Sequence, residues 1–251
     1  MIDMSAGMRD CAILRAGSIS TAVRAGDVAC MACRKETRLH ILSVASLAIP
    51  EIKIIRFGRF RDHRGYFTEV YRKSDFREQE RLGFLRDIDL LQGNESYSEP
   101  GTIRGLHFQW NPYMGKLVRT VAGHMIDLVL DIRRGAPTFG RIIAHDMAAR
   151  ADLDYGEWIW IPPGFAHGNF FLEGTCIEYH CSGEYNPACE SGISPLAHDL
   201  DWSLCDPGLR ARFDGVRAGG PLLSVKDASG FTLASWLQQP ASERFVFGNP
   251  L

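Results

Sequence analysis

Two stretches of the chain place a histidine where it could do chemistry. In the first stretch, five residues separate Gly101 from His107, and Lys116 follows nine residues after His107. The second stretch, GEWIWIPPGFAHGNF, contains His167 near its end. An imidazole, with an ordinary pKa of about 6.5, can take up a proton near neutrality, and it is also a common metal ligand. The two stretches therefore predict either a proton-transfer site or a metal centre.

The spacing of both stretches resembles the two conserved boxes of the cupin superfamily, but two positions differ. Metal-binding cupins have a second His where Gln109 stands and a Glu where Lys116 stands. A divalent metal binds lone-pair donors, and a Lys ammonium offers none. Only His107 and His167 remain as ligands, whereas a tight site needs three or more. We therefore predict no metal and no other cofactor, with a metal-dependent cupin enzyme as an alternative.

Short strands are expected to position these residues. From about Ile52 onward, short apolar runs alternate with turn signals, and two Gly-containing turns suit hairpins. One short helix is expected from Ser74, an N-cap residue, to about Leu82. The pattern predicts an all-β antiparallel fold, and the box resemblance implies a cupin-type jelly-roll barrel with a few short peripheral helices. The expected strands cover residues 52–57, 66–71, 103–109, 116–121, 125–132, 140–147, 157–161, 170–172 and 175–181.

Strict alternation along a strand assigns its side chains to two faces. Along residues 103–109, it places Ile103 and Gln109 on the face of His107. Along residues 125–132, Asp127 shares one face with Val129 and Asp131, whereas the other face is wholly aliphatic. A face that carries His, Gln and Asp predicts a polar barrel lumen, and a face in contact with water is the alternative.

The chain divides into three segments by composition. Residues 1–50 contain no Trp, Phe or Tyr, and we expect them to form a poorly ordered N-terminal extension. Residues 51–238 are expected to form the barrel domain. Residues 239–251 are expected to form a peripheral C-terminal tail.

The composition also argues against several classes of protein. A formal net charge of −2 gives no reason to expect nucleic acid or an anionic membrane as a partner. No apolar run approaches the ~20 residues that span a bilayer, and the first residues lack a secretory signal pattern. The chain has seven cysteines, an odd number that favours a reducing compartment. We therefore expect a cytoplasmic protein.

Longer motifs, in a fixed order, narrow the resemblance to one family. Between about Arg56 and Trp236, the chain closely resembles dTDP-4-dehydrorhamnose 3,5-epimerases. The motifs are DHRGYFTEV, QGNESYSEPGTIRGLHFQ, GKLVR, DIRRGAPTFG, IPPGFAHG, YHCSGEYNPACESGI and LLSVKDASGFTLASW. The resemblance implies inversion of carbons 3 and 5, beside the ketone of a nucleotide diphosphate-linked 4-keto-6-deoxyhexose, with dTDP as the favoured nucleotide. It also implies a homodimer with exchanged N-terminal strands.

The resemblance implies a role for each of four catalytic residues. His107 matches the general base, Asp227 the carboxylate that orients it, and Lys116 the cation that stabilises the enolate oxygen. Tyr179 matches the acid that returns a proton from the opposite face. These roles suit the reaction, because a weakly acidic C–H needs a nearby base and a group that stabilises the developing negative charge. The implied substrate-binding residues are Arg64, Glu69, Gln92, Asn94, Arg104, His167, Glu190 and Lys226, with Phe67 and Tyr185 beside the nucleotide base.

Arg104 raises a problem of geometry, because it is out of phase with His107 on a regular strand. Either Gly105 marks a β-bulge that brings the two side chains into phase, or Arg104 serves by another route, such as a neighbouring subunit.

Three stretches depart from the family pattern. Asn169 follows Gly168 where the family usually continues the motif from Gly to Phe. Residues 194–202, SPLAHDLDW, lack the usual Asn-Asp-Pro, and residues 108–116 read FQWNPYMGK. These stretches lie near the expected pocket and bear on the nucleotide, the hexose and the number of carbons inverted. The alternatives are a single-carbon epimerase or keto-isomerase on a related sugar, and a non-catalytic sugar-binding module.

Overall fold

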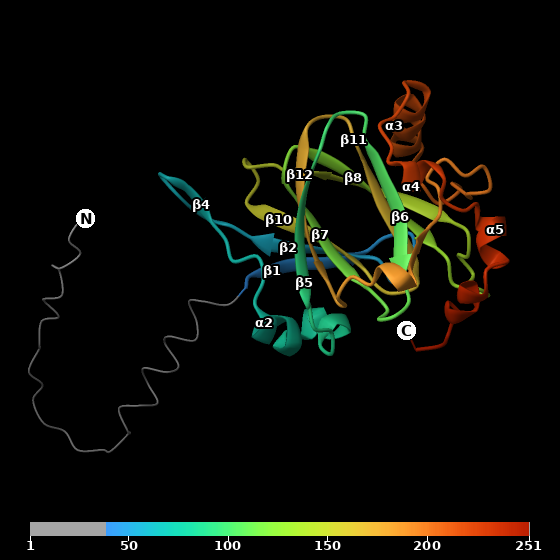
Figure 1. The fold of residues 1–251 in the computed structure, drawn as a ribbon. Coiled ribbons are helices and arrows are strands. Elements are labelled where there is room, and N and C mark those ends of the chain that lie inside the picture. The colour runs from blue at the N-terminus through green and yellow to red at the C-terminus, as the bar shows by residue number, and fades with distance from the viewer. Residues whose placement is uncertain (1–38, 251) are drawn as a thin grey trace, which may run out of the picture. The chain divides into compact units, whose positions relative to one another are not determined.

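The computed structural model describes residues 39–250, and its strands form two main sheets (Figure 1). In this part of the chain, one sheet has the order β1-β2-β10-β7-β12-β5 and the other has the order β13-β6-β11-β8-β9. The strand pairs within both sheets are antiparallel. The strands are β1 (Ile41–Ser46), β2 (Lys53–Gly58), β3 (Phe60–Asp62), β4 (Gly65–Phe67), β5 (Gln92–Ser98), β6 (Ile103–Gln109), β7 (Lys116–Ala122), β8 (His124–Asp131), β9 (Ile142–Ala148), β10 (Tyr155–Ile161), β11 (Phe165–Phe171), β12 (Thr175–Cys181) and β13 (Glu190–Gly192).

The helical segments of the described chain are short and lie outside the sheets (Figure 1). They are α2 (Lys73–Glu78), α3 (Pro207–Ala218), α4 (Val225–Ala228), α5 (Leu233–Leu237) and the 3₁₀ turns η1 (Glu80–Leu85), η2 (Pro187–Cys189) and η3 (Pro240–Arg244). The helix expected from Ser74 to Leu82 is interrupted at Gln79, whose ψ of 123° is extended. None of the helices among residues 39–250 has the length and apolar character that a membrane-crossing segment needs. The all-β antiparallel jelly roll with short peripheral helices is confirmed.

An inner cluster of buried apolar residues fills the space between the sheets. Its members come from both, including Val118 and Ile159 from one sheet and Val129 and Phe165 from the other. Asp127 precedes Val129 by two residues and is also fully buried, so its side chain shares this inner face. The prediction that the Asp127 face of β8 turns inward instead of toward water is confirmed, although apolar side chains surround the polar ones there.

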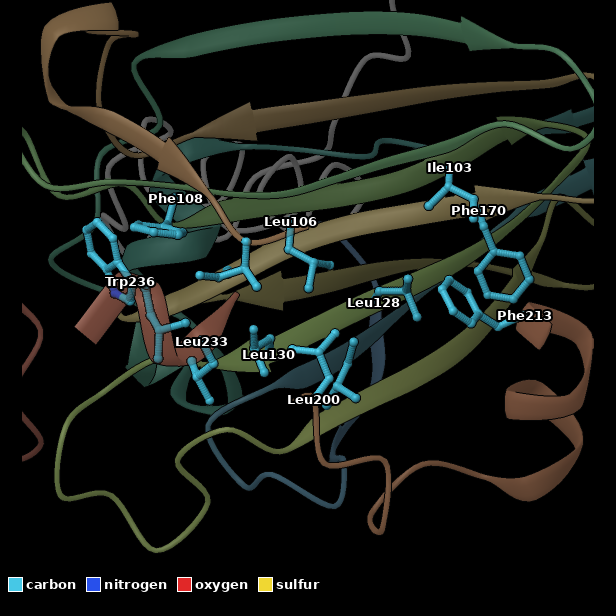
Figure 2. Close-up of a cluster of buried hydrophobic side chains, with 14 of the residues drawn as sticks. Ile103, Leu106, Phe108, Leu128, Leu130, Phe170, Leu200, Phe213, Leu233 and Trp236 are labelled. Atoms are coloured by element: carbon cyan, nitrogen blue, oxygen red, sulfur yellow. The ribbon is translucent and has the colours of Figure 1, made fainter. Parts of the chain in front are cut away.

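An outer cluster packs the opposite face of β6, β8 and β11 against the C-terminal helices (Figure 2). Leu128 and Leu130 belong to it, together with Phe213 from α3 and Trp236 from α5. Burying side chains of this size contributes on the order of 1.5–3 kcal/mol each. This packing holds the segment that follows residue 206 against the sheet.

The predicted boundaries of the domain were wrong at both ends of the described chain. At the C-terminal end, Phe245 is 0% exposed and packs edge-on against Phe108, and Ser242 is also buried, so the core extends to residue 245 into the expected peripheral tail. At the N-terminal end, β1 pairs with β2, and Leu39 and Ile41 are buried. An aliphatic strand can complete a sheet without aromatic residues, and the domain therefore begins by residue 39. The rest of the expected extension, residues 1–38, lies outside the described residues.

Candidate active site

A β-bulge in β6 sets the direction of two site residues. His107 pairs with His167, but Arg104 pairs with Asn169, so β6 has one more residue than β11 over this interval. Gly105 lies at the bulge with φ +99°, and a Cβ there would lie 2.6 Å from the Gly168 Cα. Glycine is required because a side chain would meet the neighbouring backbone at this positive φ.

The bulge corrects the alternation expected along β6. Ile103 belongs to the outer cluster with Leu106, so the prediction that it shares the face of His107 was wrong. Arg104 comes into phase with His107 on the inner face, as the bulge alternative predicted. The Arg104 guanidinium donates to the Ser98 Oγ at 2.8 Å and to the Tyr97 carbonyl at 2.9 Å. These bonds hold it along the edge of β5.

His107 is held by a carboxylate from the C-terminal helices. The Asp227 Oδ1 lies 2.6 Å from the His107 Nε2, and Asp227 is 5% exposed. Ser224 caps α4 by accepting from the Asp227 backbone N–H at 3.1 Å, which fixes the position of the carboxylate. Burial is the largest single effect on the Asp227 pKa and raises it, but the hydrogen bond and charge of His107, together with the bonds from Ser224 and the Gly105 backbone, outweigh it and lower the pKa. The arrangement orients the ring as the carboxylate of a catalytic triad does.

The electrostatic surroundings of His107 favour its neutral form. Burial is the largest effect that lowers the His107 pKa, and the nearby Lys116 charge acts in the same direction. Asp227 opposes both effects without reversing the shift. A neutral imidazole near neutral pH is the form that can accept a proton.

The facing sheet contributes an ammonium and a phenol. Lys116 begins β7, and its Nζ donates to the His107 carbonyl at 3.4 Å. Burial lowers the Lys116 pKa, while Cys181 and Asp127 act in the opposite direction. Tyr179 lies on β12 next to Val118 in the register, and burial raises the pKa of its phenol. A raised pKa keeps the hydroxyl protonated, as a proton donor requires.

These groups line one cavity of about 110 Å³. Seven of its lining residues were expected from the sequence, and they are Gln92, Asn94, His107, Lys116, Tyr179, Tyr185 and Glu190. Cys181 and Met114 also line it but were not assigned to the site. Alternation from Tyr179 places Cys181 on the same face, which was the available signal. Met114 lies in the stretch that departs from the family pattern, where no signal identified it.

Hydrogen bonds order the wall of the cavity, whereas two further expected residues, Lys226 and His167, are not among the residues that line it. The Gln92 Oε1 accepts from the Tyr185 backbone N–H at 2.8 Å, and its Nε2 donates to the Asn94 Oδ1 at 3.0 Å. Lys226, beside Asp227, forms an ion pair with Glu190. The His167 Nε2 lies 2.7 Å from the Asp127 Oδ2, and both side chains are buried.

Three expected substrate-binding residues lie elsewhere. Arg64 forms an ion pair with Asp62 in the β3–β4 hairpin, which projects away from the two sheets (Figure 1). Phe67 ends this hairpin and is 71% exposed, and Glu69 pairs with Arg72. Within residues 39–250 of one chain, these three side chains are not among the residues that line the cavity.

The donor set of the pocket does not resemble a metal site. Among residues 39–250, no group of three or more His, Cys, Asp or Glu side chains is placed to hold a metal ion. His107 on β6 and His167 on β11 are register partners on adjacent strands. The Nε2 atom of each ring already contacts a carboxylate, Asp227 for His107 and Asp127 for His167.

Comparison with known proteins places this geometry in a family. The family model described as dTDP-4-dehydrorhamnose 3,5-epimerase matches residues 46–235. A relative with that name from Sinorhizobium fredii is 39% identical over 213 residues, which cover 84% of this chain and 97% of the relative.

Solved structures agree in fold. A dTDP-6-deoxy-D-glucose-3,5-epimerase from Legionella pneumophila, in complex with dTDP-4-keto-L-rhamnose, matches with a TM-score of 0.67 at 31% identity. That match covers 84% of this chain and 100% of the Legionella chain. A 3'-monoepimerase from Streptomyces bikiniensis, in complex with dTDP-quinovose, matches with a TM-score of 0.63 at 30% identity and covers 76% and 87% of the two chains.

Proposed function

Because the chain belongs to the dTDP-4-dehydrorhamnose 3,5-epimerase family, we propose that it inverts both carbons beside the ketone of a dTDP-linked 4-keto-6-deoxyhexose. One observation carries this proposal. His107 from one sheet and Lys116 and Tyr179 from the other line the same cavity. A base, a cation and a phenol around one space are what a proton-transfer reaction at a carbon acid needs.

Proton abstraction is assigned to His107. Its neutral imidazole removes the proton from the carbon beside the ketone, and the charge that develops on the ring is stabilised by Asp227 at 2.6 Å. Asp227 also fixes the tautomer, because its contact with Nε2 leaves Nδ1 as the nitrogen that can act as the base.

Stabilisation of the enolate and return of the proton are assigned to the facing sheet. The Lys116 ammonium lies where negative charge forms on the ketone oxygen, and a fixed cation stabilises that charge more strongly in the transition state than in the ground state. The Tyr179 phenol keeps its proton because burial raises its pKa. It delivers that proton to the face of the sugar opposite His107, which inverts the carbon.

The nucleotide is proposed to bind along the rest of the pocket. Gln92, Asn94, Glu190 and Tyr185 line the cavity, and Lys226 and Arg104 provide cations at its margins. Guanidinium groups suit diphosphate oxygens because their fork allows two parallel hydrogen bonds.

The projecting hairpin supports a homodimer. Arg64, Phe67 and Glu69 lie away from the cavity of their own chain, although the family resemblance assigns them to substrate binding. We propose that they reach the pocket of a second copy, with Phe67 against the nucleotide base. Mixing Arg64→Ala protein with His107→Ala protein tests this arrangement. In a mixed dimer, the pocket that keeps His107 would receive the intact Arg64 of the other subunit, so one of the two sites would be complete. Recovery of activity on mixing is expected, and inactivity of mixtures shown to contain mixed dimers would contradict the arrangement.

The reaction itself is tested by solvent exchange. The purified protein is incubated with a dTDP-4-keto-6-deoxyhexose in heavy water, and deuterium is located by carbon position. Incorporation at carbons 3 and 5 is expected. Exchange at one carbon alone would replace the proposal with a single-carbon epimerase, which the likeness to the Streptomyces bikiniensis 3'-monoepimerase makes the relevant second candidate. Binding without any exchange would indicate a sugar-binding module.

A cytoplasmic location is also proposed. The four cysteines of the described chain, Cys176, Cys181, Cys189 and Cys205, are free thiols, as a reducing compartment favours.

A further inference from the structure

Asn169 stands where the family motif usually has Phe, and it points into the interior of the barrel. It lies on β11 two residues after His167, so the two side chains share the inner face. Its register partners are Arg104 on β6 and Asp127 on β8. Asn169 is 4% exposed and Asp127 is 0% exposed. A polar amide is therefore buried in the barrel interior, next to strand positions that carry residues of the site.

Two buried oxygens at this position lack hydrogen-bond partners. Asp127 uses its Oδ2 to bind His167, but within residues 39–250 neither the Asp127 Oδ1 nor the Asn169 Oδ1 has a partner. Directly paired residues on adjacent antiparallel strands have Cβ atoms about 4.5–5.5 Å apart, so both oxygens belong to one small region. A buried acceptor without a donor is unfavourable, and such groups in native proteins usually receive a hydrogen bond from water or ligand.

The region adjoins the reacting groups. Asp127 binds His167, whose register partner on β6 is His107. Asp127 also exerts an electrostatic effect on Lys116. Asp127 and Asn169 do not line the cavity themselves, and they lie behind it, next to the strand positions of His107 and His167.

We propose that Asn169 and Asp127 form a subsite that accepts a hydrogen bond from a ring hydroxyl of the hexose, so that Asn169 determines which sugar is used. The inference rests on the proposed function. Two acceptor oxygens together select a hydrogen-bond donor, because a ketone or phosphate oxygen would be repelled by the Asp127 carboxylate. A hexose offers hydroxyls for this purpose, whereas its methyl group cannot satisfy either oxygen.

The test compares the natural substrate class with analogues that lack one hydroxyl. Solvent exchange is measured with a dTDP-4-keto-6-deoxyhexose and with its 2-deoxy and 3-deoxy analogues, for the unchanged protein and for Asn169→Leu. The unchanged protein should favour the full substrate over one analogue by about 10- to 100-fold in kcat/KM, as expected when a buried acceptor loses its donor. Asn169→Leu should reduce that ratio several-fold. Asn249→Leu, an exposed position near the C-terminus, is the matched control and should leave the ratio unchanged.

The outcomes separate the subsite from the proposed function. If the unchanged protein exchanges no position of any of these sugars, both proposals fail. If it turns over all three with equal kcat/KM, or if Asn169→Leu lowers activity without changing the ratio, only the subsite is overturned. The second result would show that Asn169 merely supports Asp127, or that a water occupies the region. Should Asn169→Leu not fold, Asn169→Ser replaces it, and the ratios of the unchanged protein already decide whether a hydroxyl is recognised.

Discussion

Replacing Asp227 by Asn tests the base assignment most directly. The Asp227 carboxylate is 5% exposed and lies 2.6 Å from the His107 Nε2, so the substitution removes a buried, charge-assisted hydrogen bond while keeping the shape of the side chain. Hydrogen bonds to charged groups contribute about 1.5–3 kcal/mol. If that stabilisation is realised when the imidazolium forms, kcat should fall roughly 10- to 150-fold, because about 1.4 kcal/mol corresponds to one factor of ten.

The pH dependence of this variant has a definite sign. Protonated His107 cannot act as a base, so activity is lost as the pH falls through its pKa. Asp227 stabilises the imidazolium and raises that pKa, against burial and Lys116, which lower it. Removing the carboxylate should therefore lower the pKa further and move the acid limb of the kcat/KM profile to lower pH.

Position-resolved deuterium exchange across a pH series measures both the fall in kcat and the shift of the acid limb. Asp214→Asn is the matched control, because Asp214 forms an exposed i,i+4 ion pair with Arg210 on α3, remote in sequence from the cavity residues. Such a pair contributes at most about 1 kcal/mol to folding and nothing to proton transfer. Unchanged kcat, or an acid limb displaced to higher pH in Asp227→Asn, would refute the reasoning.

Lys116→Met should lower kcat more than it weakens substrate binding, measured by single-turnover kinetics and calorimetry, and an equal effect on both would remove Lys116 from the transition state. Tyr179→Phe should allow His107 to exchange its own proton while inversion slows by about 10²-fold or more, which chiral analysis of the recovered sugar detects. Phe245→Ala should destabilise the fold by about 3–5 kcal/mol in thermal or urea unfolding, whereas a peripheral residue would change it little. Treatment with a chelator should leave exchange unaffected, and elemental analysis that found a stoichiometric metal bound through His107 and His167 would support the metal-dependent alternative.

Much of the site could be read from the sequence because its motifs fall on regular strands. β6 and β12 have the predicted bounds, and they carry His107 and Tyr179. Elements that depend on distant partners were harder to predict. β5, QGNESYS, shows no apolar alternation, because its exposed edge position does not require one, and it forms by pairing with β12. Similarly, β11 contains Gly168 opposite the bulge, and the predicted strand began at residue 170, so its first five residues were missed.

The alternation of side chains between two faces gave a wrong prediction along β6, where the strand has one extra residue. Period-2 reasoning separated Arg104 from His107, and only the extra residue at the bulge brings them to one face. In the dimer that we propose, Arg64 and Phe67 reach the pocket of a second copy of the chain, an arrangement that neither the sequence nor a single subunit can position.

The closeness of Lys116 and His107 bears on the roles of base and stabilising cation that we propose for them. The Lys116 Nζ donates to the backbone carbonyl of His107, and its charge is close enough to the imidazole to lower the His107 pKa. Its charge disfavours the imidazolium and thus keeps His107 unprotonated, while in the proposed reaction the same charge favours the enolate that proton removal creates. Asp227 acts on the imidazolium in the opposite direction. Lys116→Met should therefore move the acid limb of the kcat/KM profile to higher pH than in the unchanged protein, and Asp227→Asn should move it to lower pH. A purely structural role for either residue would leave the limb where it is.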